Sequence, residues 1–100
     1  MRYTDPNTGG QKDQKLARFD LVPWGSMWRV AELYGRGAKK YDERNWELGY
    51  PWSLAIAALH RHLAQFCMGH DDEDHLAAVV FYALALMQFE ETYPEGDDRA

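Results

Sequence analysis

An apolar run near the end of the chain, Leu76 to Met87, constrains the fold more than any other segment. It contains no charged residue over about three helical turns, so a helix formed here is apolar on nearly every side. Directly before it stand four acids and an imidazole, Asp71-Asp72-Glu73-Asp74-His75. Carboxylates at a helix start are favoured by the helix dipole alone, so the acids fit simple capping. They also fit a divalent-cation site that faces a phosphorylated substrate.

Size and composition restrict the class of protein. The chain has 100 residues, which fits one small domain, and 46% of them are apolar, too many for a disordered chain. Its single cysteine, Cys67, excludes an internal disulfide and favours a reducing compartment. We find no signal-peptide core and no apolar run of the ~20 residues that cross a bilayer. We therefore expect a cytoplasmic protein with no membrane partner.

Charge is divided unevenly along the chain. Residues 1–50 carry nine Lys and Arg against seven Asp and Glu, whereas residues 51–100 carry two against nine. The net charge of −5 disfavours binding to a long nucleic acid. A basic half facing an acidic half suits a small anion held together with a metal ion, although ordinary solvated surface explains the pattern equally well.

The hydrophobic periodicity predicts an all-α fold. We expect a polar, flexible arm over residues 1–17, a single helical domain over 18–93 and a polar tail over 94–100. The predicted helices run from a cap at Ser26 to about Tyr41, from Trp52 to Met68 with Gly69 as C-cap, and from Asp72 to Thr92. The last two helices should form a central antiparallel hairpin because their link is short. Three helices cannot cover every side of the last one, so we expect a homo-oligomer, a dimer or tetramer, to complete the small bundle.

The hairpin geometry gathers a group of possible metal ligands. His62 lies about two turns before the link and His75 about one turn after it, so both should occupy the same end of the hairpin. Asp71, Asp72 and Asp74 belong to that end too. Imidazole with carboxylate suits Mn²⁺, whereas carboxylates alone suit Mg²⁺. Acids in this position also occur simply as decoration of a helix start.

A second group of residues spans the end of the first predicted helix and the connection that follows it. Lys39 and Lys40 would bind phosphate oxygens, Tyr41 and Trp46 would stack on a base, and Asn45 would read a base edge. A solvated helix end, in which cations offset the helix dipole, accounts for the lysines but not for the aromatic residues.

Isolated cations supply the remaining candidates for phosphate binding. Arg61 lies in an otherwise apolar helix, where a lone Arg more often pairs with a structural acid. Lys12, Lys15 and Arg18 would fold over a polyphosphate if the arm closes, and otherwise they only keep the arm soluble.

Several short motifs, taken in order, resemble a known family. The segment from Asp74 to Leu86 is similar to the second motif helix of the all-α nucleotide pyrophosphohydrolases of the MazG type. More closely, the chain resembles a small phage-encoded branch described as dATP/dGTP diphosphohydrolase, from about Gly9 to Glu91. The motifs that carry this resemblance are Arg18-Phe19-Asp20-Leu21-Val22-Pro23, Gly37-Ala38-Lys39-Lys40-Tyr41, Asn45-Trp46, Pro51-Trp52-Ser53, Arg61-His62-Leu63 and His75-Leu76-Ala77.

The resemblance implies a helical oligomer that cleaves a purine deoxynucleoside triphosphate to a monophosphate and pyrophosphate with Mg²⁺ or Mn²⁺, in the host cytoplasm if phage-encoded. Our leading hypothesis takes the residues of this reaction from the hairpin end, with His62, Asp74 and His75 as the catalytic residues. It places the metal among Asp71, Asp72, Asp74 and His75, with His62 as a further ligand or as the base that orients a water molecule.

The sequence departs from the MazG type at its acidic motifs. His75 and Ala78 stand where that type has an acidic pair, and residues 52–68 contain no Glu-x-x-Glu. The alternative is therefore an inactive, nucleotide-sequestering phage protein on the same scaffold. A helical assembly module whose acids only cap and solubilise is a third reading.

Overall fold

Three long helices dominate the computed structural model, which describes all 100 residues. They are α1 (Trp24–Lys40), α2 (Trp52–Cys67) and α3 (His75–Thr92), accompanied by the 3-10 helices η1 (Phe19–Leu21), η2 (Asn45–Leu48) and η3 (Pro94–Gly96) and by the strands β1 (Arg2–Thr4) and β2 (Gln11–Asp13). The predicted all-α class is confirmed. None of the helices combines the length and apolar character that a bilayer crossing requires.

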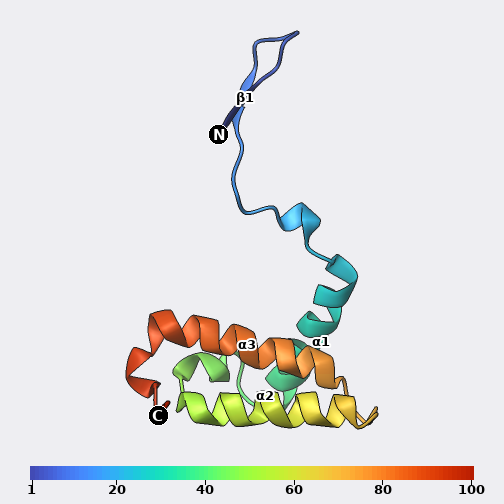
Figure 1. Ribbon diagram of the computed structural model, residues 1–100, viewed down its shortest axis with the longest axis vertical. Coiled ribbons are helices and arrows are strands. Elements are labelled where there is room, and N and C mark those ends of the chain that lie inside the picture. The colour runs from blue at the N-terminus through green and yellow to red at the C-terminus, as the bar shows by residue number, and fades with distance from the viewer.

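The helices α2 and α3 lie side by side and antiparallel, as the short link between them predicts (Figure 1). The C-cap of α2 is Met68 rather than the predicted Gly69, which follows it in the left-handed conformation, with φ +80°. The N–H of Gly69 donates to the carbonyl of Phe66, and the N–H of His70 donates to that of Gln65, both at 3.0 Å. These two bonds satisfy the last carbonyls of α2 and turn the chain back towards α3.

The start of α3 differs slightly from the prediction. The helix begins at His75 rather than Asp72, and Asp74 is its N-cap, with a carboxylate that accepts a hydrogen bond from the N–H of Ala77 at 3.1 Å. Residues 71–73 therefore belong to the loop that precedes the helix. The predicted end at Thr92 is confirmed.

The helix α1 begins three residues earlier than predicted and is only partly attached to the bundle. Ser26 lies inside the helix and the N-cap position is Pro23, which offers no side-chain acceptor, so the predicted Ser26 cap is wrong. The helix continues through Gly35 and Gly37 to Lys40 without a break. Its second half packs on α3, whereas its first turns project from the bundle (Figure 1).

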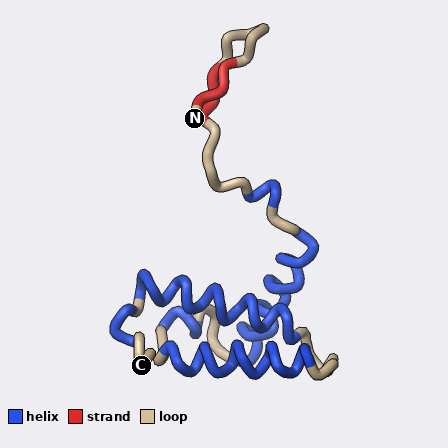
Figure 2. Tube along the Cα trace, in the orientation of Figure 1, coloured by secondary structure: helices blue, strands red, loops and turns tan.

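The N-terminal residues form a small hairpin that the sequence pattern did not predict. The carboxylate of Asp5 accepts hydrogen bonds from the N–H groups of Asn7 and Thr8, at 2.8 and 2.9 Å, and this turn brings β2 antiparallel to β1. The strands have only three residues each and are exposed throughout, so no alternation of apolar and polar residues marks them. Figure 2 shows the hairpin at the far end of an extended arm.

The hydrophobic core lies at one end of the hairpin formed by α2 and α3. The other end carries the loop between these helices, which we call the acidic loop because it contains Asp71 to Asp74. Trp52, Ala85 and Phe89 are buried there, and the C-terminal residues close over them. The indole N–H of Trp52 donates to the carbonyl of Tyr93 at 3.0 Å. Asp98 accepts hydrogen bonds from both the N–H and the hydroxyl of Ser53, and thereby caps the first turn of α2.

Two glycines provide a test of this packing. A Cβ on Gly96 would clash with the ring of Tyr93, whereas a Cβ on Gly35 meets no atom within 4 Å. We expect Gly96→Ala to lower the free energy of unfolding by about 1–3 kcal/mol, because the tail can no longer close over the core. Gly35→Ala, the control, should raise it by up to about 1 kcal/mol, since alanine favours a helix. Urea unfolding followed by circular dichroism measures both, and equal effects would contradict this packing.

Candidate functional site

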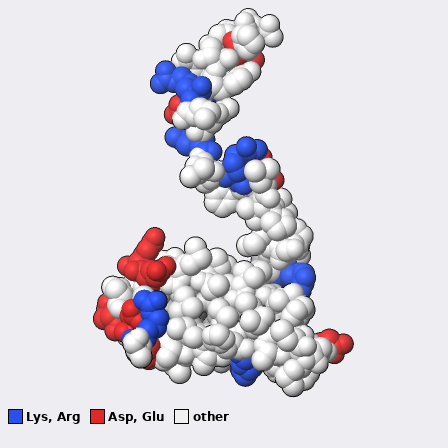
Figure 3. Space-filling view, in the orientation of Figure 1, with Lys and Arg blue, Asp and Glu red and all other residues white.

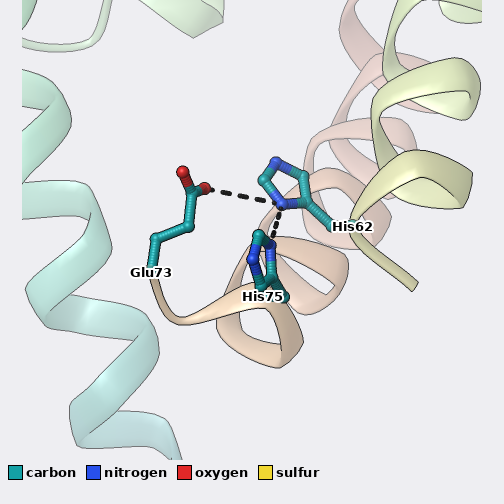
Figure 4. A group of neighbouring side chains, drawn as sticks. All are labelled: His62, Glu73 and His75. Carbon is teal, nitrogen blue, oxygen red and sulfur yellow. Dashed lines mark hydrogen bonds and ion pairs between the residues drawn. The ribbon is translucent and has the colours of Figure 1, made fainter. Parts of the chain in front are cut away.

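Two buried imidazoles join α2 to α3 beside the acidic loop. His62 is only 5% exposed and His75 only 2%. Their Nδ1 atoms lie 2.9 Å apart, and Nε2 of His75 lies 2.9 Å from a carboxylate oxygen of Asp72. Glu73 reaches in from the loop, with an oxygen 3.5 Å from Nδ1 of His62 (Figure 4). Two helices and their link thus meet at a single polar cluster.

The hydrogen bonds of this cluster fix the state of each ring. The guanidinium of Arg61, which can only donate, lies 3.5 Å from Nε2 of His62, so that nitrogen accepts and Nδ1 carries the hydrogen. Nδ1 of His62 then donates to His75, and Nε2 of His75 donates to Asp72. Burial lowers the pKa of His62, and the charge of Arg61 lowers it further, so this ring is neutral at neutral pH. The hydrogen bond from His75 lowers the pKa of Asp72 and keeps its carboxylate ionised.

Asp74 is occupied by a different partner. Its carboxylate receives two hydrogen bonds from the guanidinium of Arg29 on α1, at 2.8 and 2.9 Å, in addition to that from Ala77. The bond to Arg29 contributes most to lowering the pKa of Asp74, to about 2. The position of Asp74 therefore serves the start of α3 and the attachment of α1.

A polar cleft of about 870 Å³, which we call the acidic cleft, lies between α1 and the loop. The loop contributes the acids Asp71 to Asp74, and α1 contributes Arg29, Glu32 and Arg36. Both signs of charge line it, so it suits an anion accompanied by a cation.

A second cavity of about 1030 Å³ opens on the other side of Glu73, and we call it the aromatic cavity. Its aromatic wall consists of Tyr34, Tyr41, Trp46, Tyr50, Phe81 and Tyr82. Burial raises the pKa of Tyr50 to about 12, so its hydroxyl stays neutral in this wall. Arg61, His62 and Glu73 form a polar edge, and Glu73 lines both cavities. The volume is at the upper end of that of sites for small organic ligands.

The donor atoms around the imidazole pair fit a divalent metal ion. One possible ligand group is His62, Glu73 and His75, and another is His70, Asp72 and His75; within each, the donor atoms lie within 4.8 Å of one another. Neutral imidazole and ionised carboxylate are the forms that bind metals, and His62 would carry its hydrogen on Nε2 rather than Nδ1 to bind a metal through Nδ1. Nitrogen and oxygen donors together favour Mn²⁺ or a similar transition ion over Mg²⁺, which prefers oxygen alone.

The structure brings most of the predicted site residues together. The metal candidates Asp71, Asp72, Asp74 and His75 all line the acidic cleft. The predicted nucleotide contacts Lys40, Tyr41, Asn45, Trp46 and Arg61 all line the aromatic cavity, together with His62.

Four predicted contacts lie elsewhere. Lys12 lies in β2, and Lys15 and Arg18 follow it in the projecting arm, where Arg18 pairs with Asp20 at 2.7 Å. Lys39 is exposed on α1 and lines neither cavity. The arm extends away from the bundle, so the structure does not place its cations over a polyphosphate (Figure 1).

Sequence reasoning missed several residues that the fold brings to the site. Glu73 stands in the acidic run, but nothing in the sequence distinguishes it from its neighbours, because its direction depends on the loop. His70 directly follows Gly69. This position is the one feature of the sequence that places His70 at the same end of the helix hairpin as the acids. Arg29 and Arg36 lie on α1, and only the crossing of that helix over the loop brings them near the acids.

Comparison with known proteins leads to a family. A model of the family described as "dATP/dGTP diphosphohydrolase, N-terminal" matches residues 6–99. No curated protein matches the chain, and no solved structure does. Since the matched region is nearly the whole chain, and includes both cavities and the imidazole pair, this protein belongs to the dATP/dGTP diphosphohydrolase N-terminal family.

Proposed function

We propose that this domain hydrolyses purine deoxynucleoside triphosphates, dATP or dGTP, to a monophosphate and pyrophosphate in a metal-dependent reaction. The observation that carries this proposal is that the acidic cleft and the aromatic cavity share Glu73 as a lining residue, in a protein of this family. An aromatic cavity beside a cleft of mixed charge matches a nucleotide, which has a flat base at one end and a charged polyphosphate at the other.

The imidazole pair and the loop acids would hold the metal ion. His62, His75 and Glu73 are its proposed ligands, with Asp71 and Asp72 beside them. A divalent ion bound there supplies charge neutralisation at the phosphates and a more acidic bound water. The hydrogen bond to Asp72 orients the ring of His75, as a carboxylate commonly does for a metal-binding imidazole.

The protein's own cations and aromatic residues would bind the nucleotide. Tyr41 is 57% exposed at the rim of the aromatic cavity, where its ring would stack on a base, and the ammonium of Lys40 lies 5.3 Å from the centre of that ring. Arg61 lies between this cavity and the imidazole pair, so it is the cation best placed for a phosphate. Arg36 lines the acidic cleft and would neutralise charge there.

A nucleotide-binding protein without turnover is the second candidate. The observation in its favour is that Asp74 is held by Arg29 and by the helix cap, while His75 and Ala78 are buried at the positions where acids were expected. Such a protein would bind the same nucleotide in the same cavities and release it intact.

The proposed functional form is a homo-oligomer in the cytoplasm. Leu76, Val80 and Met87 on α3 are 37–62% exposed, an unusual position for large apolar side chains. A second subunit would remove them from water.

The decisive experiment is product analysis by anion-exchange chromatography. Purified protein is incubated with each dNTP and NTP, with Mg²⁺, with Mn²⁺ or with chelator. We expect conversion of dATP or dGTP to monophosphate and pyrophosphate, faster with Mn²⁺ and absent with chelator. Intact nucleotide in every reaction, together with tight binding, would replace this proposal by the second candidate.

Glu73→Gln tests the proposed metal site. The substitution keeps the shape of the side chain but removes the charge beside His62, so we expect Mn²⁺ affinity to fall by about 10- to 100-fold and turnover to fall with it. Titration calorimetry and the product assay measure the two. Glu90→Gln, on the exposed surface of α3, is the matched control and should change neither. Unchanged Mn²⁺ binding in Glu73→Gln would remove this residue from the ligand set.

Tyr41→Ala tests the aromatic cavity. Loss of one stacking ring costs about 1–3 kcal/mol, so KM should rise about 5- to 150-fold while kcat changes little. Tyr41→Phe retains the ring and should keep the KM of the original protein. If both variants behave alike, the base does not stack at Tyr41.

A further inference from the structure

The helix α3 has two apolar faces on opposite sides. Ala78, Ala85 and Phe89 repeat at seven and four residues and are buried against the bundle. Leu76, Val80 and Met87 repeat at four and seven residues, about 180° around the helix, and are exposed. We call this second face the outer stripe. The bundle surface in view carries no charged side chains across its middle (Figure 3).

The arm offers apolar residues that nothing in its own chain covers. Leu16 is 99% exposed, Phe19 70% and Leu21 71%, and they lead directly into Trp24 and Trp28, 62% and 71% exposed on one side of α1. This arm segment, residues 16–28, is long enough to cover the outer stripe, which spans roughly 17 Å.

The accessible surface of this chain is large enough to supply a dimer interface. A compact protein of 11.6 kDa exposes about 5800 Å², by the usual scaling of surface with mass, whereas this chain exposes 7977 Å². The surplus, roughly 2100 Å², exceeds the ~800 Å² that each partner contributes to an interface of standard size. The radius of gyration, 18.4 Å, is likewise well above the ~13 Å of a compact chain of this length.

Charge sets the direction in which the arm would lie. Residues 2–18 carry four basic residues against two acids, whereas residues 90–99 carry five acids against one arginine. In Figure 3 the basic side chains are spread along the arm and acids gather at the end of the bundle near the C-terminus. The acids at the other end of α3, Asp71 to Asp74, already face Arg29 and Arg36 of α1 across the acidic cleft. A basic hairpin next to the C-terminal end of α3 is therefore the favourable arrangement.

We propose that two copies of this chain exchange their arms: the arm segment of one copy docks on the outer stripe of α3 in the other, with its basic hairpin towards the C-terminal end of that helix. The exchange specifies how the proposed oligomer is built, and it does not depend on hydrolysis. The occupant of the stripe is a segment of this same chain, and the interface is isologous, because each copy both gives and receives an arm.

Charged substitutions on either side of the interface test the exchange. Val80→Glu on the stripe and Trp28→Glu on the arm should each raise the dimer dissociation constant at least 100-fold, as measured by size-exclusion chromatography with light scattering. Gln88→Glu is the control, because it adds the same charge at an exposed position of α3 about 100° from the stripe. Circular dichroism of each variant verifies that the helices still form.

A mixed-label NMR experiment identifies the occupant directly. In samples that combine ¹³C-labelled and unlabelled chains, we expect intermolecular contacts between the indoles of Trp24 and Trp28 and the methyl groups of Val80 and Met87. A monomer at all concentrations would overturn the proposal. A dimer in which two outer stripes touch each other, or in which the arm contacts only its own chain, would overturn it as well. Product analysis of the same sample tests the proposed hydrolysis independently of the arm exchange.

Discussion

The contact between His62 and His75 is the constraint on which the functional end of this molecule depends. Both rings are almost fully buried, and a buried imidazole without partners would cost free energy, so their hydrogen bonds must all be satisfied. Satisfying them requires α2 and α3 to approach at this level, Arg61 to face one ring and the loop to present Asp72 to the other. The same requirement fixes Glu73 between the two cavities. A single pair of rings thus sets the register of the helix hairpin and the direction of the acidic loop.

The bundle divides its tasks between its two ends. At the end of Trp52 and Phe89, apolar burial and the returning tail hold the helices together. At the end of the imidazole pair, the contacts are mainly polar, and the attachment of α1 includes the ion pair of Arg29 with Asp74. Since apolar packing supplies most of the stability of a small domain, the first end can hold the fold while the second presents unusual polar groups.

The helical spacing of apolar residues and the residues that end helices were sufficient to predict most of the fold. The apolar spacing of α2, the glycine at its end and the short link placed His62 and His75 at one end of the hairpin, and the structure confirms this. The strands of the arm escaped prediction because a turn at Asp5, rather than an apolar pattern, brings them together. The site was predicted as a set of residue types, but the direction of Glu73 depends on the loop and that of Asp74 on how α1 crosses the loop. That crossing has no signature in local sequence, because it arises from contacts between residues about 45 positions apart, such as Arg29 with Asp74.

The capping of α2 by the tail has a consequence for how the chain folds. The carboxylate that completes the first turn of α2 belongs to Asp98, 45 residues after the serine that it caps. Closing a loop of that length carries an entropic cost that is repaid only once the intervening helix has formed and reversed the chain. The first turn of α2 is therefore among the last parts of the molecule to become fully hydrogen-bonded.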